Sequence, residues 1–129
     1  MKKILIVEDD QFLSRMASKK LKENGYEVSV ASDSNQAFEI LKSQTPDMIL
    51  LDLLLPGTDG FELLAKFKQN EKTKKIPILV FSNLSGEGDI KKCQDLGIRD
   101  FVVKSSCTLN ELVDRVNKTT EENSSTSSL

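Results

Sequence analysis

The stretch MILLD at residues 48–52 indicates the fold, because four consecutive apolar residues end abruptly at a carboxylate. Similar short apolar runs occupy residues 4–7, 26–31, 78–81 and 101–103. Continuous rather than alternating hydrophobicity is typical of strands that are covered on both faces, as in a parallel sheet between two layers of helices. The five runs therefore predict five buried strands.

Segments with helical spacing of apolar residues alternate with these runs. They lie at residues 12–21, 37–41, 61–67, 90–94 and 109–116. Asn24-Gly25 is the kind of pair that ends a helix, and Asp59 is a suitable N-cap. Strict alternation of strands and helices predicts an α/β fold with a doubly wound, five-stranded parallel sheet and five helices. Functional groups are then expected at the carboxyl ends of the strands.

The chain of 129 residues falls in the usual range for one domain. We place that domain at residues 1–118. The remaining residues, 119–129, read TTEENSSTSSL and contain one apolar residue, at the very end. Such a segment cannot bury enough surface to offset its ordering entropy. We therefore expect a disordered, Ser/Thr-rich tail.

Composition excludes several function classes. The 18 Lys and Arg residues and 20 Asp and Glu residues give a net charge of −2, so there is no strong field to attract nucleic acid or an acidic membrane. Histidine is absent, which excludes Ser-His or Cys-His catalytic pairs and imidazole metal sites. The sequence shows no zinc motif, signal peptide or membrane-length apolar stretch. We expect a cytoplasmic protein that binds neither membranes nor, directly, nucleic acid.

Polar residues follow four of the apolar runs, at the point where each strand ends. They are Glu8, Asp9 and Asp10 after the first run, Asp52 after the third, Ser82 after the fourth and Lys104 after the fifth. Any one of them is explained by the chain having to leave the core. Because the carboxyl ends of parallel strands meet at one edge of the sheet, the four together predict a single site.

Several carboxylates in one crevice repel one another unless a cation neutralises them. All-oxygen ligands favour a hard ion such as Mg²⁺. A metal, a lysine and a hydroxyl around one carboxylate are a sufficient set for phosphoryl transfer. We expect Asp52 to be the nucleophile and Asp9, alone or with Glu8, to hold the metal. Ser82 would donate to a phosphoryl oxygen, and Lys104 would pair with the carboxylate or its adduct.

The motifs ILIVEDD, LLDLLLPGTDG, ILVFSN and DFVVK stand in a specific order and spacing. In these motifs the sequence resembles the receiver domains of two-component response regulators over roughly its first 118 positions. The resemblance implies the flavodoxin-like strand order 2-1-3-4-5. It also implies that Asp52 is the phosphoacceptor, Glu8 and Asp9 the acidic pair, and the backbone carbonyl of Leu54 a further metal ligand. As a hypothesis, the apolar Leu54 side chain slows self-dephosphorylation.

The resemblance also assigns the residues around the acceptor. Ser82 takes the position of the switch hydroxyl, Lys104 that of the family lysine, and Phe101 that of the aromatic that moves on phosphorylation, although core packing explains Phe101 equally well. Ser105 stands where the family commonly has a proline after a cis bond, so we expect the loop after the fifth strand to run differently. Asn83 stands where a very small residue is common. It would narrow the phosphoryl pocket or donate a hydrogen bond within it.

The function implied by the resemblance is that of a phosphoacceptor in a two-component phosphorelay. The donor would be a histidine kinase or phosphotransfer protein, and phosphorylation would switch a binding surface for a downstream protein target. The chain would be a stand-alone regulator, not an enzyme, catalysing only its own phosphorylation and dephosphorylation. Homodimerisation on phosphorylation stays open.

Two alternatives remain at this point. A pseudo-receiver, which binds a partner constitutively, is kept open by the loss of the usual Lys-Pro pair. An aspartyl-phosphate hydrolase of the haloacid dehalogenase type uses similar groups, but its first strand normally ends in DxD. Residues 8–11, EDDQ, do not supply that pattern.

Overall fold

The computed structural model describes the backbone of residues 1–127 and the side chains of residues 1–121. Its five strands are β1 (Lys3–Val7), β2 (Glu27–Ala31), β3 (Met48–Leu51), β4 (Ile78–Ser82) and β5 (Asp100–Val103). Its five α-helices are α1 (Gln11–Glu23), α2 (Ser34–Ser43), α3 (Gly60–Gln69), α4 (Glu87–Asp95) and α5 (Leu109–Ser127), and a 3₁₀ turn, η1 (Lys104–Ser106), follows β5. None of these described helices combines the length and apolar composition needed to cross a membrane.

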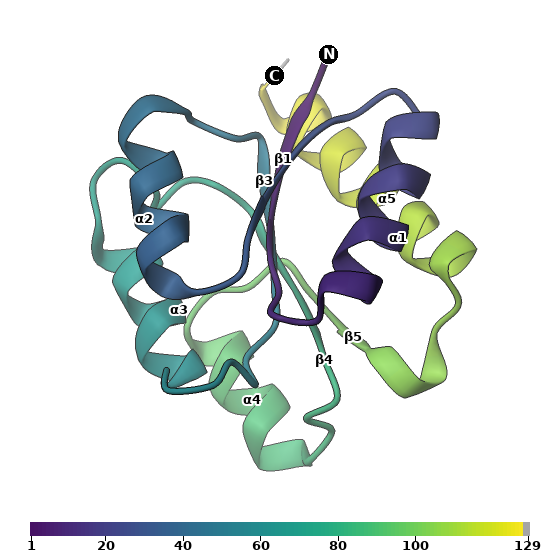
Figure 1. Cartoon of the computed structure of the whole chain (residues 1–129). Coiled ribbons are helices and arrows are strands. Elements are labelled where there is room, and N and C mark those ends of the chain that lie inside the picture. The colour runs from purple at the N-terminus through teal and green to yellow at the C-terminus, as the bar shows by residue number, and fades with distance from the viewer. Residues whose placement is uncertain (128–129) are drawn as a thin grey trace.

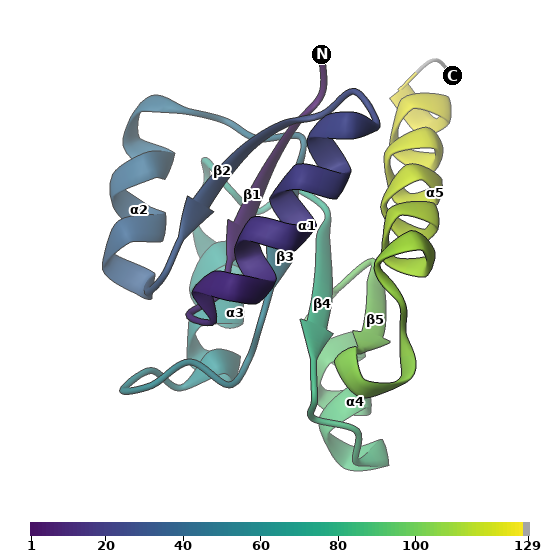
Figure 2. The ribbon, with the colours of Figure 1, turned by 45° about the vertical axis from the view of Figure 1, so that its right-hand side comes forward.

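The strands form one parallel sheet in the order β2-β1-β3-β4-β5, which confirms the predicted fold and strand order. Figure 1 shows α1 and α5 on one face of this sheet and α2, α3 and α4 on the other. The same layers are visible from a second direction in Figure 2, where the arrowheads of the strands point toward one edge. That edge carries the residues that follow the strands.

The core consists of two apolar clusters, one on each face of the sheet. In β1, Leu5 and Val7 belong to the cluster beneath α2, α3 and α4, whereas Ile4 and Ile6 belong to the cluster beneath α1 and α5. All four side chains are at most 2% exposed. Coverage of both faces explains why the run is continuously apolar, because neither set of alternate side chains meets water.

Aspartates begin three of the helices. Asp10 accepts a hydrogen bond from the Leu13 N–H at the start of α1, and Asp33 does the same for the N–H of Gln36 in α2. The predicted cap of α3 is also present, since Asp59 accepts from the first backbone N–H groups of that helix. Each cap satisfies a backbone donor that lacks an intrahelical partner. At the other end of α1, Gly25 adopts a φ of 91°, which ends the helix.

Helix α4 is the least firmly anchored of the helices. Its N-cap is Gly86, which offers no side-chain acceptor, and Cys93 is its one fully buried side chain. A further contact joins α4 to α3, because the Lys92 ammonium lies 4.3 Å from the centre of the Phe61 ring. Because α4 has one buried side chain and no side-chain cap, we expect it to open at a lower free-energy cost than the rest of the fold.

The structure describes α5 through Ser127, so the boundary that we expected at residue 118 falls inside this helix. Thr119 and Thr120 are buried, and the Thr119 hydroxyl donates to the carbonyl of Arg115. The Thr120 carbonyl accepts from Lys2. The prediction counted only apolar residues, whereas both threonines are buried and their hydroxyls donate to carbonyls of the preceding turn of the helix. Residues 128 and 129 of the expected tail lie outside the described residues.

Candidate functional site

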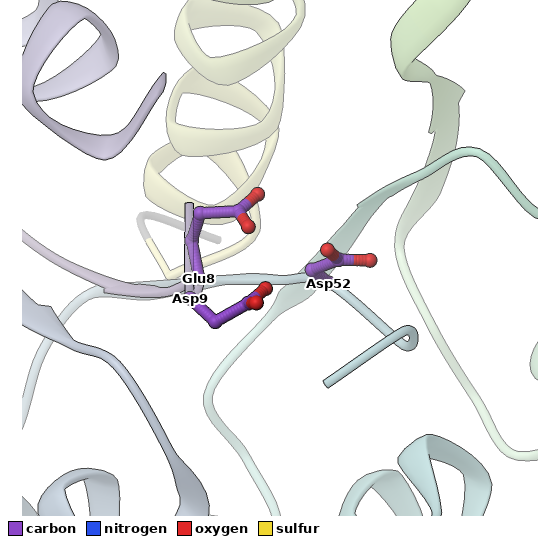
Figure 3. A group of neighbouring side chains, drawn as sticks. All are labelled: Glu8, Asp9 and Asp52. Carbon is purple, nitrogen blue, oxygen red and sulfur yellow. The ribbon is translucent and has the colours of Figure 1, made fainter. Parts of the chain in front are cut away.

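Three carboxylates meet where β1 and β3 end. Glu8 and Asp9 follow β1 and Asp52 follows β3, and the two strands are direct neighbours in the sheet. One oxygen from each carboxylate lies within 4.8 Å of the others. Figure 3 shows the Glu8 and Asp9 side chains reaching toward Asp52. The structure thus brings these three residues together as the sequence led us to expect.

Two of the three carboxylates are held firmly inside the protein. Glu8 is 4% exposed and Asp52 is 5% exposed, whereas Asp9 is open to solvent. Asp52 Oδ1 accepts from the N–H of Leu54 at 3.0 Å, and Glu8 Oε2 accepts from the N–H of Asp10 at 3.0 Å. These backbone donors fix one oxygen of each buried carboxylate, and the other oxygen of each contacts the Lys104 ammonium.

Lys104 supplies positive charge to this cluster from the end of β5. Its ammonium donates to Asp52 Oδ2 at 2.8 Å and also forms an ion pair with Glu8. The Lys104 side chain is 15% exposed, so these contacts are only weakly screened by water. One ammonium against three carboxylates still leaves an excess of negative charge.

The pKa values of the site follow from burial and charge. Burial raises the pKa of Glu8 above its ordinary value and the Asp52 charge adds to this, against partial opposition from Lys104 and the Asp10 N–H. Burial alone would lower the pKa of Lys104, but hydrogen bonds to Asp52 and Glu8 outweigh it, and the net shift is upward. Burial and the surplus of negative charge both disfavour the ionised form of Glu8. A bound cation stabilises that ionised form. The all-oxygen donor set of Glu8, Asp9 and Asp52 fits a hard divalent ion such as Mg²⁺.

Ser82 lies at the carboxyl end of β4, whereas Phe101 lies two residues before the end of the neighbouring strand, β5. Ser82 is fully buried at the end of β4 and pairs with Val103, so it lies beside the residue that precedes Lys104. Its hydroxyl oxygen accepts a long hydrogen bond, 3.4 Å, from the N–H of Leu84. Phe101 pairs with Val80, farther into the sheet, and packs partly buried against the core. Ser82 is therefore at the site, whereas the contacts of Phe101 are those of a core residue.

The loop after Asp52 is held against the start of α3. A Cβ on Gly60 would lie 2.2 Å from the carbonyl oxygen of Leu53, so only glycine permits this close approach. Leu53 is buried, while the next residue, Leu54, turns outward and is 51% exposed. The apolar Leu54 side chain is therefore half exposed two residues after Asp52.

A hydrogen bond that the sequence did not reveal joins the loops after β4 and β5. The N–H of Ser105 donates to Asn83 Oδ1 at 2.9 Å. The sequence led us to expect Asn83 to narrow the pocket or to donate within it, but in the structure its carboxamide oxygen accepts. The bond exists only because residue 105 is not proline, which has no N–H. The two departures from the family pattern, at adjacent strand ends, thus form one interacting pair.

Comparisons with known proteins bear on the fold and the family of this chain. A family model described as the response regulator receiver domain matches residues 4–117. The response regulator PleD of Caulobacter vibrioides is 37% identical over 102 residues, which make up 79% of this chain and 22% of PleD. The chain covers 22% to 51% of the length of the curated relatives that it resembles.

Two solved structures resemble the chain in both fold and sequence. The receiver domain of the sensor histidine kinase PA1611 from Pseudomonas aeruginosa PAO1, with a magnesium ion coordinated in its active-site cleft, is 27% identical with a TM-score of 0.80. The match covers 93% of this chain and 98% of that domain. The phosphorylated cyanobacterial phytochrome response regulator RcpA is 34% identical with a TM-score of 0.79, over 93% of this chain and 91% of RcpA.

Proposed function

Since this chain belongs to the family of response regulator receiver domains, we propose that it accepts a phosphoryl group on Asp52 and thereby switches a protein-binding surface. One observation carries the proposal: Asp52 contacts the Lys104 ammonium inside a cluster of carboxylates. A nucleophile, a cation and a metal-binding set then share one crevice. The donor is a phosphohistidine on another protein, a histidine kinase or phosphotransfer protein, and no histidine of this chain could supply it.

Asp52 acts as the nucleophile. A carboxylate oxygen attacks the phosphorus, the P–N bond of the phosphohistidine breaks, and its electron pair stays on the imidazole, which takes up a proton from water. The product is an acyl phosphate on Asp52. No general base is needed, because a carboxylate is already ionised near neutral pH.

The residues around Asp52 stabilise the charge that develops during this transfer. Lys104 moves its ammonium from the free carboxylate to the phosphoryl oxygens, and Ser82 donates its hydroxyl to one of them. Glu8, Asp9 and Asp52, with the backbone carbonyl of Leu54, are the residues that would hold Mg²⁺. The ion supplies electrostatic stabilisation of the phosphoryl oxygens. The magnesium ion of the PA1611 domain and the phosphorylated state of RcpA support this assignment by similarity.

The output of this chemistry is a change in binding rather than turnover of an external substrate. Ser82 is the switch hydroxyl and Phe101 the aromatic residue that moves with it, which alters the surface offered to a downstream protein in the cytoplasm. Homodimerisation on phosphorylation is one form that this change can take. The pseudo-receiver alternative has less support, because the three carboxylates lie together and Lys104 pairs with Asp52.

Intact-mass measurement after incubation with Mg²⁺ and acetyl phosphate tests the proposal. The wild-type chain should gain one phosphoryl group, and Asp52→Asn should gain none. Asp95→Asn is a matched control, because Asp95 is an exposed carboxylate on α4, and it should be phosphorylated like the wild type. A gain that persists in Asp52→Asn, or no gain in any of the three proteins, would contradict the proposal.

A further inference from the structure

We infer that Asn83 is a positioning residue, which holds Lys104 in place for phosphoryl transfer by accepting the Ser105 backbone N–H. The inference rests on the proposed function, because Lys104 belongs to that same site. The bond between Asn83 Oδ1 and Ser105 N measures 2.9 Å and joins residues 22 positions apart in the chain. It links the loop after β4, which begins at Asn83, to the turn that carries Lys104.

The turn after β5 has little else to hold it. It has no side-chain cap, and the hydrogen bond at its end, from Cys107 N to the Lys104 carbonyl, is long at 3.4 Å. Ser105 and Ser106 are exposed. The bond from the Ser105 N–H to Asn83 ties this exposed turn to the loop after β4. A proline at position 105 would restrict the backbone covalently, whereas serine leaves it free to rotate unless an acceptor holds its N–H.

The restraint acts on the geometry of the site through Lys104. Lys104 is the first residue of the turn, and its ammonium contacts both Glu8 and Asp52. A long lysine side chain has many rotamers, so its ammonium stays between two carboxylates only if the backbone that bears it is fixed. The last pair of the β4–β5 ladder joins Ser82 to Val103. Asn83 extends that link past the ends of the strands and so sets the spacing between the Ser82 hydroxyl and the Lys104 ammonium.

Phosphorylation kinetics with acetyl phosphate and Mg²⁺ test the inference. Asn83→Ala should lower the maximal rate constant roughly threefold to tenfold, the range expected for one hydrogen bond, with little change in the half-saturating donor concentration. Asn70→Ala is the matched control, since Asn70 Oδ1 accepts from the N–H of Lys72 at 2.8 Å in an exposed position outside the site, and it should react like the wild type. No loss of rate in Asn83→Ala would overturn the inference.

A double-mutant cycle separates action through Ser105 from a direct effect of Asn83. Ser105→Pro removes the donor, so adding Asn83→Ala in that background should change the rate by less than about twofold. The same loss in both backgrounds would show that Asn83 acts on the phosphoryl group itself, which overturns the inference.

Nuclear magnetic resonance of the unphosphorylated protein provides a readout that does not depend on phosphoryl transfer. The Ser105 amide and the Lys104 ammonium protons should be protected from exchange in the wild type and in Asn70→Ala, and less protected in Asn83→Ala. Unchanged protection of either group in Asn83→Ala would overturn the inference even if Asp52 is phosphorylated. Reduced protection of both groups would support the positioning role even if Asp52 were never phosphorylated, in which case the proposed function alone fails.

Discussion

The Leu54 side chain is half exposed next to the proposed acceptor, and an apolar group there cannot hydrogen-bond an incoming water. In Leu54→Asn the carboxamide could orient such a water, so the half-life of the phosphorylated protein should fall roughly twofold to tenfold. The measurement is the loss of the phosphoryl mass gain with time after the donor is removed. Met16→Gln, a polar change at another exposed apolar side chain, should leave the half-life as it is. An unchanged half-life in Leu54→Asn would refute the shielding role of Leu54.

Lys104 stabilises two buried carboxylates as well as serving the proposed chemistry. Lys104→Met keeps the methylene stem but leaves Glu8 and Asp52 without their positive partner. The free energy of unfolding at neutral pH in EDTA should fall by about 2 to 4 kcal/mol, because buried charges without a partner are costly. Urea titration measures this loss. Lys42→Met, which breaks an exposed pair with Glu39, should change the free energy by less than about 1 kcal/mol.

The pH dependence of that loss identifies its cause. The pKa of Glu8 is raised, so the folded protein keeps a proton on Glu8 above pH 4.5, the ordinary value, where the unfolded chain has lost it. The stability contributed by this proton is present below pH 4.5 and declines as pH rises through the folded-state pKa. Without Lys104 the pKa of Glu8 rises further, so the deficit of Lys104→Met should shrink as pH falls and when Mg²⁺ is added. A deficit independent of both would assign the loss to packing.

At the scale of elements, the opening of helix α4 can be measured through the reaction of a thiol reagent with Cys93. Cys93 is its one fully buried side chain, and burial raises the pKa of that thiol to about 11. At pH 8 only about one in a thousand such thiols is ionised, so a thiol reagent attacks Cys93 when α4 opens and its surroundings change. In a Cys107→Ser background, which leaves one thiol, the rate of labelling therefore reports the opening of α4.

Gly88→Ala should slow this labelling roughly twofold to fivefold. Gly88 lies in the first turn of α4, and an added Cβ meets nothing within 4 Å, so the substitution strengthens the helix without a clash. Asn35→Ala, which replaces an exposed residue of α2 with a better helix former, should leave the rate unchanged if α4 opens on its own. Equal slowing by both substitutions would mean that labelling follows global unfolding.

Most helices and strands were predictable, because the position of a strand follows from the run of residues that forms it. The runs in β1 and β3 are apolar throughout since both faces of the sheet are covered, and Asp59 signals the start of α3 by its own side chain. The convergence of Glu8, Asp9, Asp52 and Lys104 followed from parallel strands ending at one edge. The Asn83–Ser105 bond was not predictable in this way. It depends on which side-chain atom faces the neighbouring loop, and no residue pattern encodes that.

At the scale of the whole molecule, the C-terminal part of α5 is joined to the start of the chain. The Tyr26 hydroxyl lies 2.5 Å from Asn117 Oδ1 and 3.1 Å from Thr120 Oγ1, and the Lys2 ammonium donates to the Thr120 carbonyl at 3.2 Å. These contacts could not be predicted, because residues 119–129 are polar and include one apolar residue, at the very end. Thr119 and Thr120 are buried because the amphipathic part of α5 before them places them against the N-terminal part of the fold, where Thr120 contacts Tyr26 and Lys2.

A chain that ends at Lys118 should therefore be less stable than one that ends at Glu121. The shorter chain lacks both buried threonines and their hydrogen bonds, so its free energy of unfolding should be lower by about 1 to 3 kcal/mol. Urea titration of the two chains side by side measures the difference. Equal midpoints and slopes would show that the domain is already complete at residue 118.

The bond between Lys2 and Thr120 also shows that the start of the chain lies close to the C-terminal part of α5. Figure 1 shows the N-terminus and the last described turns of α5 at the edge of the sheet opposite the one at which the strands finish. A short peptide could bridge the two ends, and new ends could be cut at a surface loop, without disturbing the order in which strands pair. Because its two ends are close together, the domain could also be inserted into a loop of a fluorescent reporter protein. Its acidic crevice, at the opposite edge of the sheet, would then face away from the reporter.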